Sequence, residues 1–132
     1  DYGHHPTEVK ATLAAVRQAY PDRRLVVLFQ PHRYTRTKIL ASQFGTVFNH
    51  ADLVFLQDIY PAGEKPIKGV TAKLIFDAMK RNRVNVEHVP GIGSAIIPKI
   101  LPQLKTGDVV LTLGAGDVWK RGLELAAGLK KQ

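Results

Sequence analysis

The sequence predicts one α/β domain over residues 1–132, with a mostly parallel sheet and helices on both faces. Short apolar runs alternate with segments of helical periodicity, which is the pattern of parallel α/β units. The apolar runs, such as LVVLF at 25–29, are continuous, as in strands that are buried on both faces. The length of 132 residues, with 45% hydrophobic and 23% charged residues, is typical of a single globular domain.

The first predicted element is a helix over residues 8–20. Its apolar residues recur at helical spacing and form one stripe: Val9, Leu13, Val16 and Tyr20. Pro6 fits the first helical position, because the N–H that proline lacks has no partner there. An α/β unit normally begins with a strand, so we expect the chain to be a piece of a longer protein whose preceding strand ends just before Asp1.

The later elements alternate in the same way. Strands are predicted at four places: 25–29, 53–56, 85–89 and 108–113. Helices are predicted between and after them: 36–48, a segment whose apolar face carries Val70, Leu74, Ile75, Ala78 and Met79, then 95–104 and 118–130. Pro98 and Pro102 disfavour a regular helix interior in the segment 95–104.

Composition excludes several classes of protein. The chain has no cysteine, which excludes a disulfide scaffold and a thiolate metal site. No apolar run approaches the roughly 20 residues of a membrane helix. The formal net charge of +8 favours anionic partners. A basic nucleic-acid-binding module is one interpretation of that charge, but the sequence has no recognition-helix cluster and no run of exposed aromatic residues.

Polar residues and glycines gather in the loops that follow the predicted strands. Ligands bind beyond the carboxyl ends of the strands in open parallel sheets, so these loops are the candidate site. They are DYGHHP at 1–6, QPHRYTR at 30–36, QDIYPAGE at 57–64, PGIGS at 90–94 and LGAGD at 113–117.

Two of these loops carry candidate anion ligands. His4 and His5 precede a helix N-terminus, where they could bind an anion, or one could cap the helix while the other is solvated. Arg33 and Arg36 are three residues apart, so their planar guanidinium groups could hold one carboxylate or phosphate. The alternative is a solvated basic turn.

The other loops are less specific. Glu64 could receive an ammonium group, or it could belong to an ordinary Pro/Gly loop. Gly114 and Gly116 resemble part of a dinucleotide-binding turn and would suit a nucleotide-binding regulatory domain, but the third glycine is missing and a tight turn explains them equally well. The chain contains no GxxxxGK[ST] segment.

Four segments in this order and spacing resemble one family: DYGHHPTE (1–8), FQPHRYTRT (29–37), YPAGE (60–64) and GAGD (114–117). They are similar to the carboxy-terminal domain of the UDP-N-acetylmuramate–L-alanine ligases, a branch of the Mur ligases of peptidoglycan synthesis. The resemblance runs from Asp1 almost to the end of the chain. The wider group of Mur and folylpolyglutamate ligases shares Asp-x-x-His-x-Pro, which Asp1, His4 and Pro6 match.

The resemblance implies a three-domain, ATP-dependent carboxylate–amine ligase in the bacterial cytoplasm, with this Rossmann-like domain closing over the active site. The implied reaction joins L-alanine to the lactyl carboxylate of UDP-N-acetylmuramate through an acyl phosphate, in cell-wall synthesis and hence cell shape and division. The amino-terminal and central domains would be its partners, and the central domain would bind most of ATP and magnesium. No nucleic acid or membrane partner is implied, and the isolated chain is expected to be inactive.

The resemblance also implies roles for individual residues. Tyr2, His4, Arg33 and Arg36 match positions that contact the incoming alanine, with His4 at the reacting centre as the catalytic residue. Asp1 matches a nucleotide contact. Residues placed near the site only by their loops are His5, His32, Tyr60, Glu64 and Asp117. No metal ligand is implied within this chain.

A sister ligase is the nearest alternative within the family. That enzyme attaches a ready-made tripeptide to the same nucleotide sugar and shares the DxxHHP type of start. HRYTR followed by YPAGE favours the alanine enzyme. GAGD is followed by Val118 and Trp119, where the family pattern has a smaller, glycine-containing stretch, so the role of this loop stays open.

Overall fold

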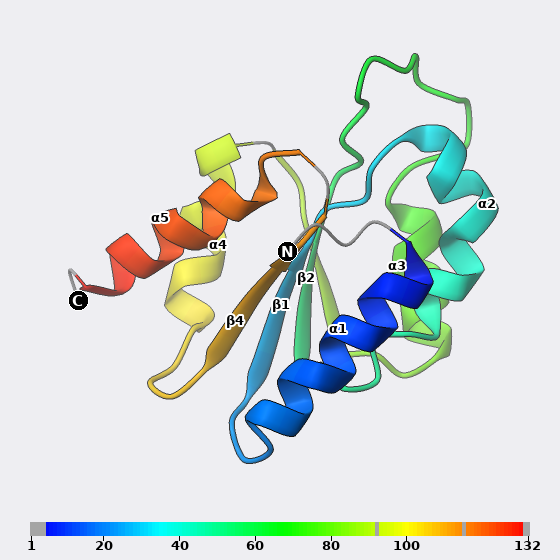
Figure 1. The fold of residues 1–132 in the computed structure, drawn as a ribbon. Helices are drawn as coiled ribbons and strands as arrows, with labels where there is room; N and C mark the ends of the chain where they lie inside the picture. Colours follow the sequence, from blue (N-terminus) through cyan, green and yellow to red (C-terminus); the bar gives the residue numbers. More distant parts are fainter. Residues whose placement is uncertain (1–4, 92, 115, 131–132) are drawn as a thin grey trace.

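Four parallel strands form the centre of the molecule, as predicted (Figure 1). The computed structural model describes residues 5–91, 93–114 and 116–130. The strands are β1 (Leu25–Phe29), β2 (Leu53–Gln57), β3 (Val86–Val89) and β4 (Val109–Leu113). Their order across the sheet is β3-β2-β1-β4.

The strand order creates a switch point between β1 and β4. From β1 the chain moves outward through β2 to β3, and it then crosses to β4 on the other side of β1. Val27 is the Cα partner of Val54 in β2 and of Leu111 in β4, so β1 lies at the centre of the register. The connections that leave β1 and β4 run in opposite directions, which opens a crevice at their carboxyl ends.

Helices cover both faces of the sheet (Figure 1). One face carries α1 (Pro6–Ala19), α2 (Tyr34–Gly45) and α3 (Lys73–Arg81). The other carries η1 (Gly93–Ile96), α4 (Ile97–Ile100), η2 (Leu101–Gln103) and α5 (Val118–Lys130). The predicted arrangement of helices on both faces is confirmed.

Each face of the sheet has its own apolar core. Side chains alternate along a strand, so Val27 and Phe29 face α1 and α2, whereas Val26 and Leu28 face α4 and α5. On the first face, the Phe29 ring lies 5.1 Å from that of Phe44, between ring centroids. All five residues of β1 are buried, which is why this strand is apolar throughout.

The segment predicted as one helix at 95–104 is broken into three short pieces, η1, α4 and η2. Pro98 lies in the first turn of α4 and Pro102 in the first turn of η2. Proline has no backbone N–H, and only in the first turn of a helix does this cost no hydrogen bond. Each proline therefore begins a new helical piece instead of continuing the preceding one.

Three other predictions need correction at their ends. The helix predicted at 36–48 begins earlier, at Tyr34, and ends at Gly45. Val70 is buried but precedes α3, which begins at Lys73. Tyr20, assigned to the apolar stripe of the first helix, follows α1 and is 47% exposed.

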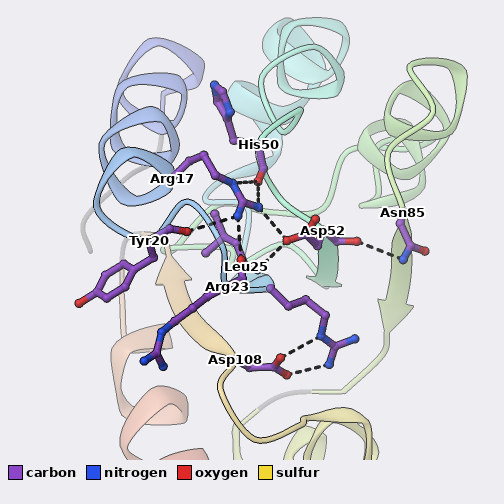
Figure 2. A network of polar contacts seen from close by, with 9 residues as sticks. Arg17, Tyr20, Arg23, Leu25, His50, Asp52, Asn85 and Asp108 are labelled. Carbon is purple, nitrogen blue, oxygen red and sulfur yellow. Dashed lines mark hydrogen bonds and ion pairs between the residues drawn. The ribbon is translucent and has the colours of Figure 1, made fainter.

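A network of polar contacts joins the loops at the amino ends of the strands (Figure 2). The Arg17 guanidinium donates to the Asp52 carboxylate (2.7 Å) and to the carbonyls of His50 (2.6 Å) and Arg23 (2.7 Å). Arg24 donates to both carboxylate oxygens of Asp108, at 3.0 and 2.7 Å. These arginines are engaged in holding the strand starts together, on the edge of the sheet opposite the candidate site.

Candidate functional site

A cavity of about 490 Å³ lies at the carboxyl edge of the sheet. Its lining comes from the loops after β1, β2, β3 and β4: Gln30, Tyr60, Pro61, Gly93 and Asp117. The cavity therefore lies at the switch point, where the loops predicted to carry the chemistry meet. Tyr60 and Asp117 were predicted as site residues, whereas Gln30, Pro61 and Gly93 were not singled out.

Gly114 allows the loop after β4 to lie close to the loop after β1, and both Gly114 and Gly116 have positive φ angles. A Cβ at Gly114 would lie 2.7 Å from the carbonyl oxygen of Gln30, and its φ is +144°. A Cβ at Gly116 would lie 3.5 Å from the Tyr60 ring, and its φ is +93°. Both positions favour glycine, so the tight-turn interpretation of this loop has a direct structural basis.

The loops after β1 and β2 are joined through their backbones. The N–H of Arg33 donates to the carbonyl of Tyr60, and the N–H of Tyr60 donates to the carbonyl of Pro31, each at 2.8 Å. The rings of His32 and Tyr60 stack with centroids 5.6 Å apart. Two segments that are distant in the sequence thus form one unit beside the cavity.

Arg36 lies in the first turn of α2 and folds back on this unit. Its Nη1 lies 2.9 Å from Nδ1 of His32 and donates to the His32 carbonyl at 3.3 Å. A guanidinium can only donate, so Nδ1 of His32 must be the acceptor and carry no proton. The contact holds the half-buried Arg36 side chain and sets the tautomer of His32.

Arg33 has an unusual backbone conformation immediately before α2. Its φ is +73° and its ψ is +143°, a region that residues with side chains rarely adopt. The side chain is exposed, and it makes no hydrogen bond within the described part of the chain. Among the described residues the Arg33 guanidinium therefore has no hydrogen-bond partner, while its backbone N–H is held by the carbonyl of Tyr60.

Glu64 caps the N-terminus of α2. Its Oε1 accepts from the N–H groups of Tyr34 (2.7 Å) and Thr35 (3.1 Å), and its Oε2 accepts from the Thr35 hydroxyl (2.6 Å). The pKa of this carboxyl is lowered, mainly by the hydrogen bond from the Thr35 hydroxyl; desolvation opposes the shift, while the two N–H groups and the nearby Arg33 charge add to it.

His5 is the N-cap of α1. Its Nδ1 accepts a hydrogen bond of 3.2 Å from the N–H of Thr7. The capping alternative for the histidine pair thus applies to His5. Asp1, Tyr2 and His4, the remaining predicted residues of this loop, lie outside the described residues.

Three buried polar side chains were missed by the sequence analysis, and one of them, Gln30, lines the cavity. Gln30 and Gln57 each end an apolar run at a carboxyl end and are 4% and 1% exposed. Arg121 in α5 is 7% exposed and its Nε lies 2.8 Å from a carboxylate oxygen of Glu124. A polar residue directly after a buried strand is the signal that could have identified the two glutamines.

The described ranges contain neither a cluster of metal-binding side chains nor a membrane-spanning helix. They contain no group of three or more His, Cys, Asp or Glu side chains that could hold a metal ion. None of their helices combines the length and apolar character that a membrane crossing requires.

Curated relatives match nearly the whole chain. A UDP-N-acetylmuramate–L-alanine ligase of Endomicrobium trichonymphae is 55% identical over 127 residues, covering 96% of this chain and 27% of the relative. A ligase of the same name from Bdellovibrio bacteriovorus is 54% identical over 127 residues, covering 95% of this chain and 27% of the relative. The chain thus spans about a quarter of the length of these relatives.

Solved structures have the same fold. A UDP-N-acetylmuramate-alanine ligase from Thermotoga maritima superposes with a TM-score of 0.74 at 23% identity, covering 99% of this chain and 26% of that one. A murein peptide ligase from Psychrobacter arcticus gives a TM-score of 0.75 at 21% identity, with 98% and 26% covered. The family model described as Mur ligase, glutamate ligase domain matches residues 1–116. The chain therefore belongs to the Mur ligase family, as its glutamate ligase domain.

Proposed function

We propose that this domain supplies the amino-acid-binding side of a ligase that joins L-alanine to UDP-N-acetylmuramate at the expense of ATP. The observation that supports the proposal is the paired loop unit at the switch point: the backbone N–H of Arg33 is held by Tyr60, which lines the cavity, and Arg36 contacts His32, whose ring stacks on Tyr60. The names of the relatives at 54% and 55% identity support L-alanine over the tripeptide of the sister ligase.

In this proposal the two arginines bind the carboxylate of alanine. A guanidinium matches a carboxylate in bidentate fashion, and Arg36 is already oriented by His32. The amine nitrogen then attacks the carbonyl carbon of the acyl phosphate, the bond from that carbon to the phosphate oxygen breaks, and phosphate leaves with the electron pair. The ammonium group must lose one proton before attack, for which His4 is our candidate acceptor. The nitrogen loses a second proton as the amide forms, and the departing phosphate takes it.

The remaining parts of the reaction are assigned outside this chain. We propose that a central domain holds most of ATP and magnesium, with Asp1 as the contact from this side, and that an amino-terminal domain holds the uridine nucleotide. The reaction would take place in the bacterial cytoplasm, because it consumes ATP there. Peptidoglycan synthesis, and through it cell division, would depend on the product.

The arginine assignment can be tested in a polypeptide of the relatives' length that carries this domain. We expect Arg33→Ala and Arg36→Ala each to raise the KM for alanine about tenfold to a hundredfold, since a charge-assisted hydrogen bond contributes roughly 1.5–3 kcal/mol. Arg36→Lys keeps the charge but loses the planar fork, so it should also raise this KM. Alanine-dependent phosphate release is the measurement.

The KM for UDP-N-acetylmuramate is the internal control and should change little in these variants. A change in ATP dependence with an unchanged alanine KM would show that the arginines bind the other substrate. Replacing alanine by a tripeptide in the same assay distinguishes the alanine ligase from the sister ligase that attaches a tripeptide. Preferential use of the tripeptide would contradict the L-alanine assignment.

A further inference from the structure

We propose that Glu64 is a positioning residue, which locks the first turn of α2 onto the loop at 60–64 and so fixes where Arg33 and Arg36 point. The inference rests on the proposed function of this arginine pair. Glu64 itself would not touch the substrate.

The hydrogen bonds that the Glu64 carboxylate accepts come from the residues between the two arginines. Tyr34 and Thr35 donate three hydrogen bonds to the carboxylate, at 2.6–3.1 Å, and both oxygens are used. Arg33 precedes these residues and Arg36 follows them, so the carboxylate fixes the backbone from which both guanidinium groups extend. An ammonium group would have to compete with these donors for the carboxylate oxygens.

The loop that carries Glu64 is built to present it. Ala62 and Gly63 have φ values of +52° and +85°, and the N–H of Glu64 donates to the carbonyl of Pro61 (3.1 Å), which closes a tight turn. A left-handed alanine is unfavourable. This strained turn directs the chain back toward α2, and the strain is offset where Glu64 caps the helix.

A second anchor makes the unit stiff. Tyr60, four residues before Glu64, binds the N–H of Arg33 through its carbonyl and stacks on His32, which in turn contacts Arg36. The two anchors hold the segment 32–36 at both of its ends. Loss of the Glu64 anchor should leave the fold intact but let the α2 start, and with it the arginine pair, depart from its position.

Steady-state kinetics of the full-length polypeptide can test this role. We expect Glu64→Ala to raise the KM for alanine about tenfold to a hundredfold, because small displacements of positioning groups have effects of this size. The kcat at saturating alanine and the KM for UDP-N-acetylmuramate should change little. Glu64→Gln keeps one oxygen that can accept the backbone N–H groups, so it should recover most of the loss.

A double-mutant cycle with Arg36→Ala is the decisive measurement. If Glu64 acts through the arginines, Glu64→Ala should raise the alanine KM of the Arg36→Ala variant by a smaller factor than it raises that of the wild type, because only Arg33 is left to be displaced. Additive effects, or a Glu64→Gln variant as impaired as Glu64→Ala, would overturn the proposal and indicate direct charge contact with the substrate amine. Unchanged kinetics in Glu64→Ala would overturn it as well.

Two variants complete the design. Glu87→Ala is the matched control, because Glu87 is an exposed carboxylate whose side chain accepts from Gln103, away from the cavity lining. Thr35→Val removes the hydroxyl donor to Glu64 and replaces Glu64→Ala if that variant does not fold; no change in its alanine KM would count against the proposal. An unchanged alanine KM in the arginine variants would contradict the proposed function. If Glu64→Ala still raised the alanine KM in that case, Glu64 would not act through the arginines.

Discussion

Individual residues at the two edges of the sheet have different tasks. At the carboxyl edge, Arg33 keeps a φ of +73° because its N–H is held by the Tyr60 carbonyl, and its charge stays exposed. Such backbone strain, of order 1–3 kcal/mol, persists where the surroundings determine it. At the amino edge, the Arg24 guanidinium forms an ion pair with the Asp108 carboxylate, and the Asp108 side chain is only 5% exposed. The first edge favours ligand binding and the second favours stability.

The Arg24–Asp108 pair predicts a pH-dependent stability. The hydrogen bonds from Arg24 are the main cause that lowers the pKa of Asp108, and the Lys105 N–H and the charges of Arg24 and Lys105 add to it, while desolvation opposes it. Because the folded pKa lies below the unfolded value of about 3.9, the stabilisation is present above that pH and is lost as the pH falls through the folded pKa. We expect Asp108→Asn to lower the free energy of unfolding by about 1–3 kcal/mol at pH 7.

Urea unfolding of wild type and Asp108→Asn between pH 7 and pH 3 is the measurement. The difference between the two proteins should shrink below about pH 4. Asp77→Asn is the control, because Asp77 pairs with Lys73 on an exposed helix surface and such a pair contributes about 0.3–0.5 kcal/mol. A difference that stays constant with pH would contradict the assignment.

Packing between elements depends on one glycine that the sequence analysis did not identify. Gly45 ends α2 where this helix meets α3. A Cβ at Gly45 would lie 2.6 Å from the Cβ and 2.7 Å from the backbone of Ala78. The backbone of α3 cannot retreat as a flexible side chain could, so the close contact of these two helices requires the missing Cβ.

We therefore expect Gly45→Ala to lower the free energy of unfolding by about 2 kcal/mol, since overpacking a core costs roughly 1–3 kcal/mol. Gly128→Ala is the matched control, because a Cβ in α5 would meet only the movable end of the Leu101 side chain, at 2.8 Å. The free energy of unfolding should fall less in Gly128→Ala, because a gain in helix propensity of up to about 1 kcal/mol offsets the cost of the close contact. Chemical denaturation measures both; equal losses would refute the packing argument.

At the scale of the whole molecule, the paired loops form an open face at one edge of a stable sheet. The relatives are about three and a half times as long as this chain, which covers 27% of their length. A site that is completed only when another domain closes over it excludes water and positions its reactants at that moment. We therefore expect most of the affinity for each substrate to need the rest of the enzyme.

The isolated chain is expected to unfold in one cooperative transition and to release no phosphate from ATP with alanine and UDP-N-acetylmuramate present. Calorimetry should show only weak binding of alanine and of ATP. The full-length polypeptide, assayed in parallel, is the positive control. Alanine-dependent phosphate release, or micromolar alanine binding by the isolated chain, would contradict this prediction.

The sequence alone determined the fold class and selected the edge of the sheet that carries the candidate site. Buried parallel strands require continuous apolar runs, and this constraint is local enough to identify β1 and β2 from their residues; β4 has the same apolar run, although as an edge strand it is mostly half-buried. The rule that ligands bind at carboxyl ends then selected the loops with Arg33, Arg36, Tyr60 and Asp117. The family resemblance rested on these same segments and is confirmed by the family match.

Only the tertiary structure decided how those loops combine. The cap that Glu64 places on α2, the stacking of Tyr60 on His32 and the clearance at Gly45 each join residues about 30 positions apart in the chain. No periodicity or local propensity reports such contacts, because they arise from the pairing of strands and helices across the fold. The helix starts were shifted for the same reason: α2 begins at Tyr34 because a carboxylate from another loop satisfies its first N–H groups.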